Sequence, residues 1–366
     1  MRLPRDLHPV AWWAWAVGLA VAASCTTNPI LLLVLLGVVA LVVVSCRSDQ
    51  PWARSFRLYL WLGAVVLVVR ILFRILLGGD VPGHVLFTLP EIPLPRFAAG
   101  ISLLGAFTRE ELLAATYEGL RLATLLIAVG GANALANPKR LMKSLPPALY
   151  EIGTAMTVAI SVVPQLADSA RRVRAAQQLR GGPEGRFRRI RGVRRLLVPI
   201  LEDSFDRSLA LAAGMDARGY GRTGELTAAQ RRSTGGLIIA GLLGVCVGVY
   251  AFLDSSAPRI LALPMLVLGM ATALVGFALA GRRVGRTRYR PDRWQLPEIL
   301  VAASGIAAGA GMWAVQRWEP LVAHPGVLVA PGVSLFAVAA ALVAVLPVWV
   351  APLPLTVQRR EAVLAS

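Results

Sequence analysis

The chain is 366 residues long, and 56% of these residues are hydrophobic while only 16% are charged. A soluble domain of this length would have about a quarter of its residues charged, so the composition excludes an ordinary soluble protein and favours a membrane protein. The net charge of +18 lies in segments that flank apolar runs, and no separate basic module of the kind that binds nucleic acid is present.

Eight apolar runs have the length and composition of membrane-crossing helices, although the first is short. Thr26-Thr27-Asn28-Pro29 separates the first two runs, which suits a tight turn, so we expect a helical hairpin that stays in the mature protein rather than a cleaved signal peptide. Thr108 and Glu111 have the spacing of a capping box at the start of the fourth run. The eight runs cover residues 9–24, 29–46, 58–78, 111–134, 235–253, 260–281, 297–316 and 327–350.

The distribution of basic residues predicts the orientation of these helices. With the N-terminus in the cytoplasm, 31 of the 38 Lys and Arg residues fall in cytoplasmic segments and four in outer loops. Cytoplasmic loops of membrane proteins carry an excess of Lys and Arg. We therefore expect a multi-pass protein of the cell membrane with both termini in the cytoplasm.

Residues 135–234 separate the first four predicted spans (1–134) from the last four (235–366). Asn137 and Pro138 predict a short helix by supplying its cap and first-turn proline. Residues 149–180 and 193–218 then show apolar residues at helical spacing. At about 1.5 Å per residue, each of these amphipathic helices would reach more than about 30 Å along the membrane surface. Such a pair predicts a lever or platform rather than a globular core.

Both amphipathic helices end in an arginine followed by a glycine. The first ends at Leu179-Arg180-Gly181 and the second at Ala217-Arg218-Gly219. One interpretation is structural, because glycine is favoured just past a helix end and arginine in the last turn complements the helix dipole. The other is that each arginine is a bidentate donor to a partner protein, a role that lysine would fill poorly.

The run from Asn137 to Gly221 resembles the transmembrane T component of energy-coupling-factor (ECF) transporters, the EcfT/CbiQ family. The resemblance covers residues 1–235 well, and Leu179 stands where the family usually has alanine, which leaves the adjacent arginine in place. The matching elements are Leu7-His8-Pro9, Asn137-Pro138, Leu145-Pro146, Val163-Pro164, Arg171, Ala176-Gln177, Leu179-Arg180-Gly181, Leu197-Val198-Pro199 and Met215-Asp216-Ala217-Arg218-Gly219-Tyr220-Gly221.

This resemblance implies a fold and a role. The two amphipathic helices would be cytoplasmic coupling helices of an all-α integral membrane protein with about eight transmembrane helices. Their tips, Leu179-Arg180-Gly181 and Ala217-Arg218-Gly219, would each dock into one of two cytoplasmic ABC ATPase subunits. A separate membrane-embedded S component would bind the substrate, a vitamin, a vitamin precursor or a transition metal.

The motifs that the chain lacks agree with a role without catalysis. No Gly-Lys pair occurs, so there is no P-loop, and we expect ATP to be bound by partner ATPases and no cofactor or metal to be held by this chain. Arg70, Arg74 and Arg121 lie inside predicted spans. An ionisable residue there marks a functional site, such as a substrate path, or is satisfied by packing against neighbouring helices, and we favour packing.

The sequence is also compatible with two other functions. A membrane enzyme acting on a lipid-linked substrate would need paired acids, for which Glu202, Asp203 and Asp206 are the candidates. A stand-alone secondary transporter would show an internal repeat between its halves, and none is apparent.

Overall fold

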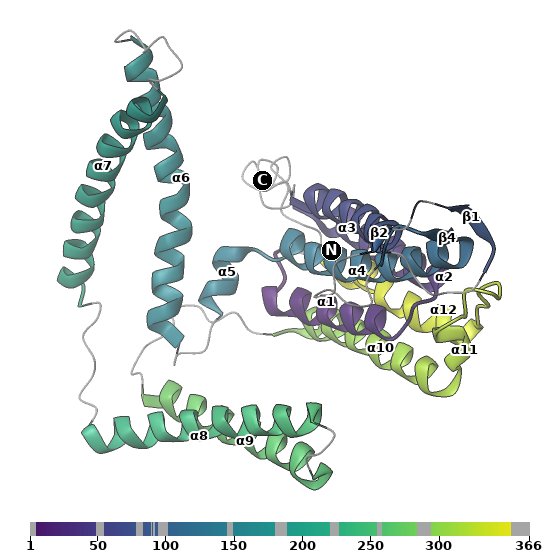
Figure 1. The fold of residues 1–366 in the computed structure, drawn as a ribbon. Helices are drawn as coiled ribbons and strands as arrows, with labels where there is room; N and C mark the ends of the chain where they lie inside the picture. The colour runs from purple at the N-terminus through teal and green to yellow at the C-terminus, as the bar shows by residue number, and fades with distance from the viewer. Residues whose placement is uncertain are drawn as a thin grey trace, which may run out of the picture. The chain divides into compact units, whose positions relative to one another are not determined.

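The computed structural model describes residues 5–48, 55–77, 83–88, 90, 92–93, 102–144, 149–179, 189–219, 227–254, 258–283 and 294–352. These residues are almost entirely helical (Figure 1). Within the described residues, six helices are long and apolar enough to cross a membrane, and shorter apolar helical segments cover Pro9–Ser24 and Leu335–Val350. The all-α membrane fold is thereby confirmed.

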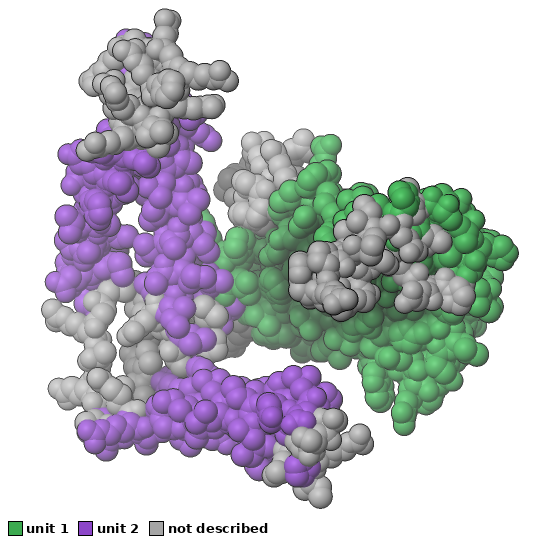
Figure 2. Space-filling model, in the orientation of Figure 1, with its two compact units in different colours: residues 1–141, 292–366 green, residues 142–291 purple. Residues whose placement is uncertain are grey.

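The chain divides into two units, residues 1–141 with 292–366 and residues 142–291 (Figure 2). The sections predicted from the sequence follow chain order, whereas the units follow contacts, so helices near the C-terminus join those near the N-terminus in unit 1. The helices of unit 1 are α1 Pro9–Ser24, α2 Pro29–Cys46, α3 Phe56–Leu77, α4 Arg109–Leu135, α10 Leu296–Trp318, α11 Pro320–Ala323, α12 Leu335–Leu342, the 3₁₀ turn η5 Val343–Val345 and α13 Pro347–Val350.

Several helix starts follow directly from local sequence. Asn28 Oδ1 accepts a hydrogen bond from the Ile30 amide at 3.0 Å, and Pro29 occupies the first position of α2. At α4 the predicted capping box is confirmed, because Thr108 and Glu111 each accept a hydrogen bond from the other's backbone amide at 3.2 Å. The short helix predicted after Asn137 is also present, as α5 Pro138–Lys143.

Two small antiparallel strand pairs connect α3 to α4. β1 Val85–Thr88 pairs with β4 Ala106–Thr108, and β2 Ile92–Pro93 pairs with β3 Ser102–Leu103. The register of the first pair shifts between Val85 and Phe87. These strands are far too short to form a core of their own.

The core of unit 1 forms where α1, α2, α4 and α10 meet. Trp15 of α1 is fully buried and donates from its indole nitrogen to the Ala344 carbonyl at 3.0 Å. Gly309 approaches α1 so closely that an added Cβ would lie 2.8 Å from the Gly18 carbonyl oxygen. Gly305 and Gly309, two small residues four positions apart on α10, therefore lie at a helix contact, as such pairs do in membranes.

The eighth predicted span differs from the structure. Helix begins at Leu335 rather than residue 327, and η5 interrupts it before α13. The segment before Leu335 instead contacts the start of α2, where Asn28 Nδ2 donates to the Gly332 carbonyl at 2.8 Å. The Asn28 side chain, in the turn between α1 and α2, thus supplies the hydrogen bond that the Gly332 carbonyl would receive from backbone if this segment were helical.

Unit 2 contains two helical hairpins. α6 Tyr150–Leu179 and α7 Arg189–Ala217 run antiparallel, and α8 Ala228–Leu253 and α9 Arg259–Arg283 form a second pair (Figure 1). In the second pair an added Cβ on Gly248 would lie 2.6 Å from the Leu266 nitrogen, which shows how closely the backbones approach. The two long helices predicted over 149–180 and 193–218 are confirmed, the second beginning four residues earlier than predicted.

Candidate partner-binding site

The candidate site is the α6–α7 hairpin, which carries both predicted tip motifs. Leu179 is the last residue of α6 and is 90% exposed. Arg180 and Gly181 lie outside the described residues. At the end of α7, Ala217 is the last helical residue, and Arg218 and Gly219 form the turn that follows.

The end of α7 combines features of both interpretations of the motif. The Gly219 amide donates to the Asp216 carbonyl at 2.9 Å, and Gly219 has φ of 75°. Glycine adopts this left-handed conformation without the strain that a Cβ brings, so Gly219 terminates the helix. Arg218 and Gly219 are nevertheless exposed. A glycine cap therefore leaves the arginine available to a partner, and the two interpretations are compatible.

The antiparallel arrangement separates the C-terminal ends of the two helices. α6 has 30 residues and α7 has 29. Since the end of α6 lies beside the start of α7, the two C-terminal ends are separated by about one helix length, roughly 45 Å at 1.5 Å per residue. The structure therefore holds Leu179 and Ala217, the described helical ends of the two tips, far apart, an arrangement that suits contacts with two different proteins.

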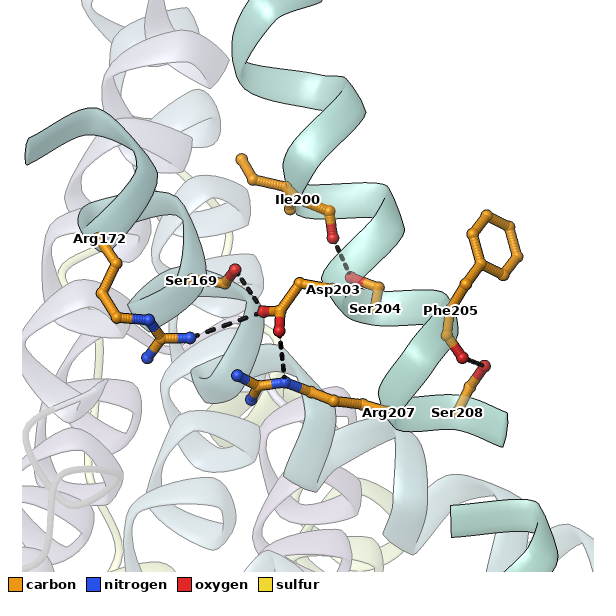
Figure 3. A network of polar contacts seen from close by, with 8 residues as sticks. All are labelled: Ser169, Arg172, Ile200, Asp203, Ser204, Phe205, Arg207 and Ser208. Atoms are coloured by element: carbon orange, nitrogen blue, oxygen red, sulfur yellow. Dashed lines mark hydrogen bonds and ion pairs between the residues drawn. The ribbon is translucent and has the colours of Figure 1, made fainter. Parts of the chain in front are cut away.

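A polar network ties α7 to α6 near the middle of the hairpin (Figure 3). Ser169 Oγ of α6 donates to Asp203 Oδ2 at 2.6 Å, and Arg172 Nη2 of α6 lies 3.6 Å from the same oxygen. Arg207 Nε donates to Asp203 Oδ1 at 3.0 Å from one turn further along α7. Together these contacts make Asp203 the polar link between the two helices.

The environment of Asp203 favours its charged form. The hydrogen bond from Ser169 lowers the pKa of Asp203 below the usual aspartate value, and Arg207 and Arg172 lower it further. In the sequence, Asp203 was a candidate acid of a membrane enzyme, together with Glu202 and Asp206. An aspartate that is held ionised by a hydroxyl and two guanidinium groups is suited to joining helices and poorly suited to donating a proton. The sequence could have indicated Arg207 as a partner of Asp203, because the two lie at i, i+4 on α7, whereas Ser169 and Arg172 belong to another helix.

The inner faces of α6 and α7 enclose a groove of about 370 Å³. Its lining mixes apolar side chains such as Leu166 and Leu211 with Ser161, Gln165 and Asp203. Large apolar side chains are also exposed along the hairpin, which is typical of a surface that other molecules cover. They include Ile152, Met156, Val163, Leu197, Leu201, Phe205 and Leu209.

The described residues contain no group of three or more His, Cys, Asp or Glu side chains that could hold a metal ion. The three cysteines, Cys25, Cys46 and Cys246, are free thiols. Arg121, one of the three arginines predicted inside spans, donates from its guanidinium to the Ser24 carbonyl at the end of α1. For this residue the structure supports the packing role that we favoured.

Comparison with known proteins connects this geometry to a family. The family model described as cobalt transport protein, CbiQ, matches residues 1–228, which include both α6 and α7.

Curated relatives carry the description energy-coupling factor transporter transmembrane protein EcfT. The protein of Streptococcus equi is 31% identical over 187 residues, which is 49% of this chain and 66% of that protein. The protein of Bacillus subtilis is 32% identical over 95 residues, 25% of this chain and 34% of its own length. The matched part thus spans less than two thirds of either relative. Since the family model covers well over half of the sequence, the chain belongs to the CbiQ family of cobalt transport proteins and is a membrane component of a transporter rather than an enzyme.

Proposed function

We propose that this chain is the energy-coupling transmembrane component of an ECF-type importer, which links two cytoplasmic ATPases to a substrate-binding S component. The observation that carries the proposal is the α6–α7 hairpin, whose two C-terminal ends lie about one helix length apart, roughly 45 Å. A component that contacts two ATPases needs two separate docking points, and this hairpin supplies one at each end.

The hairpin would act as a mechanical link. When the ATPases close on ATP, they would draw the ends of α6 and α7 into a new arrangement. Because a helix transmits displacement along its length and Asp203 ties the helices together, motion at the ends would change the angle at which they cross. The exposed apolar side chains of the same hairpin would pass that motion to the S component, as an apolar contact is the natural interface between membrane subunits.

The substrate would be recognised elsewhere. The S component would bind a transition metal, a vitamin or a vitamin precursor, and the coupling chain would need no ligand or cofactor site of its own. ATP would be bound only by the partner ATPases, in agreement with the absence of a Gly-Lys pair from the sequence.

The orientation follows from the same proposal. ATPases are cytoplasmic, so residues 135–234 must face the cytoplasm. The basic residues of the sequence support this, since 18 of them lie between residues 135 and 234. Both termini would then also be cytoplasmic, and the membrane would be the cell membrane.

Co-expression with ABC ATPases from the same genome tests the proposal. Affinity purification through this chain should retain two ATPase subunits, and the complex should hydrolyse ATP. The chain purified alone should show no saturable nucleotide binding at micromolar concentration. Saturable binding by the isolated chain, or purification free of both ATPases under conditions that keep it folded, would contradict the proposal.

A further inference from the structure

A groove of about 600 Å³ lies between α3 and α4 of unit 1, and none of its lining residues belongs to the α6–α7 hairpin that the proposed function uses. Its wall combines aliphatic side chains with two arginines and a glutamate. The lining residues are Val65, Val66, Val69, Arg70, Phe73, Arg74, Leu77, Ala114, Ala115, Glu118 and Leu122.

The polarity of the groove changes along α3 in the direction that crosses the membrane. α3 has 22 residues and is apolar enough to span a bilayer. At 1.5 Å per residue, Arg74 lies about 5 Å and Arg70 about 10 Å from the end of the helix at Leu77, whereas Val65 lies about 18 Å from it. The hydrocarbon core is about 30 Å thick, so the charged end of the groove is near the membrane surface and the apolar end lies in the hydrocarbon.

The described residues satisfy the charges at the shallow end only in part. Arg70 donates to Glu118, and both side chains are about half exposed, at 47% and 52%. Arg74 Nη2 lies 3.9 Å from Glu111 Oε1, whose side chain is fully buried. Arg74 Nε and Glu111 Oε1 are both buried, and neither has a hydrogen-bond partner among the described residues. A guanidinium carries five N–H donors, and the side chains of Arg70 and Arg74 are 47% and 34% exposed, so their exposed Nη groups keep capacity for a further acceptor.

We propose that this groove binds a phospholipid, with the phosphate between Arg70 and Arg74 and an acyl chain along Val65, Val69 and Leu122. Arginine binds phosphate through paired hydrogen bonds, and basic pockets between membrane helices accommodate lipid head groups. The groove prefers an anionic lipid such as phosphatidylglycerol, because the choline group of phosphatidylcholine would add a positive charge beside the two arginines. A membrane helix of a partner would instead bring apolar side chains against donors that need acceptors. The site requires only that α3 and α4 cross the membrane, and it is independent of the proposed function.

Photocrosslinking in vesicles tests the site. A benzophenone amino acid at Phe73, which lines the groove and is 53% exposed, is placed in the full chain and reconstituted in phosphatidylcholine containing a minority of phosphatidylglycerol. The lipid in the crosslinked adduct is then identified by mass spectrometry. We expect phosphatidylglycerol to be enriched severalfold over its fraction in the vesicle. The matched control is the same amino acid at Leu72, which is 57% exposed and does not line the groove, and there the adducts should follow bulk composition.

Three variants identify the arginines as the cause. The double variant Arg70→Gln with Arg74→Gln should lose the enrichment, whereas Arg57→Gln, at the other end of the same helix, should keep it. Glu118→Gln removes the carboxylate that competes for Arg70, so it should raise the enrichment, a gain that misfolding cannot produce. Adducts at residue 73 that follow bulk composition would overturn the proposal. So would retained enrichment in the double variant, or adducts with protein rather than lipid when the reaction is repeated in cell membranes.

Discussion

Single side chains in the α6–α7 hairpin separate into those that face partners and those that hold the hairpin together. Arg218 and Leu179 are exposed at helix ends, while Asp203 is engaged by residues of both helices. Substitution of an exposed residue at a helix end should affect assembly without changing the fold. Substitution of Asp203 should change the geometry of the hairpin. The two kinds can be tested independently.

At the helix ends we expect Arg180→Ala with Arg218→Ala to abolish substrate uptake while the protein remains folded in the membrane. A charge-assisted contact contributes about 1.5–3 kcal/mol, and about 1.4 kcal/mol corresponds to tenfold, so each single change should weaken assembly or coupling by roughly ten- to a hundredfold. Lysine at either position should rescue poorly, because it keeps the charge but not the planar fork. Retention of the ATPases during purification and uptake of substrate are the measurements.

Arg174→Ala is the matched control for this pair, because Arg174 is an exposed arginine on α6 six residues before Arg180. It should leave assembly and uptake unchanged. If the tip arginines only cap their helices, the double variant will lose a few tenths of a kcal/mol of helix stability and retain transport. Wild-type assembly and uptake in the double variant would leave the hairpin without its predicted contacts.

Near the middle of the hairpin, Asp203→Ala should loosen the link between α6 and α7. The change removes the acceptor of the Ser169 hydroxyl and the partner of Arg172 and Arg207. Spin labels on cysteines introduced at Ala175 and Gly214 report the separation of the two helices, and we expect a broader distance distribution in the variant. Asp206→Asn, an exposed carboxylate on the same helix, should leave the distribution unchanged.

The lowered pKa of Asp203 determines how the contact between α6 and α7 depends on pH. A depressed carboxyl pKa means that the ionised form stabilises the hairpin above the ordinary aspartate range, and that this contribution is lost as the pH falls through the folded-state pKa. Acidification below that range should therefore broaden the wild-type distribution toward that of Asp203→Ala. A distribution that is already as broad in the wild type at neutral pH would contradict the role of this residue.

Pairs of helices within each unit depend on small residues where backbones meet. In α10 a Cβ at Gly309 would lie 2.8 Å from backbone of α1, whereas one at Gly37 of α2 would meet nothing within 4 Å. Gly309→Ala should therefore force the helices apart and destabilise the protein by about 1–3 kcal/mol, the usual cost of overpacking. Gly37→Ala adds the same methyl group to an open position and should be nearly neutral.

Thermal unfolding in detergent, followed by size-exclusion chromatography of the remaining folded protein, measures this difference. We expect a lower midpoint for Gly309→Ala than for Gly37→Ala and wild type. Equal midpoints for the two variants would mean that α1 and α10 are not in the tight contact that the structure describes.

The orientation of the whole molecule is tested by cysteine labelling. After the native cysteines are replaced, a cysteine at Gly214 should react with a membrane-impermeant reagent only from the cytoplasmic side, and one at Gly326 only from outside. Both glycines have open space around a built Cβ, so neither change should disturb the fold. Labelling of residue 214 from outside would place the hairpin away from any cytoplasmic ATPase and contradict the proposed function.

The sequence by itself determined six of the eight predicted spans, the capped helix starts and the two long helices. A bilayer requires an unbroken run of about twenty apolar residues, and the Thr108–Glu111 box acts within one turn, so both are readable locally. The family was also readable, because Met215 to Gly221 and the other matching motifs are short contiguous runs.

Only the tertiary structure decided which faces meet. α1 and α2 are apolar all round, so their sequences do not show that Trp15 is buried or that Gly18 meets α10. Asp203 and Asn28 also contact residues of other elements, Ser169 and Gly332, which lie 34 and 304 residues away along the chain. Such contacts arise when separate elements pack together, and for that reason the sequence could propose Asp203 as an acid while the fold made it a link between helices.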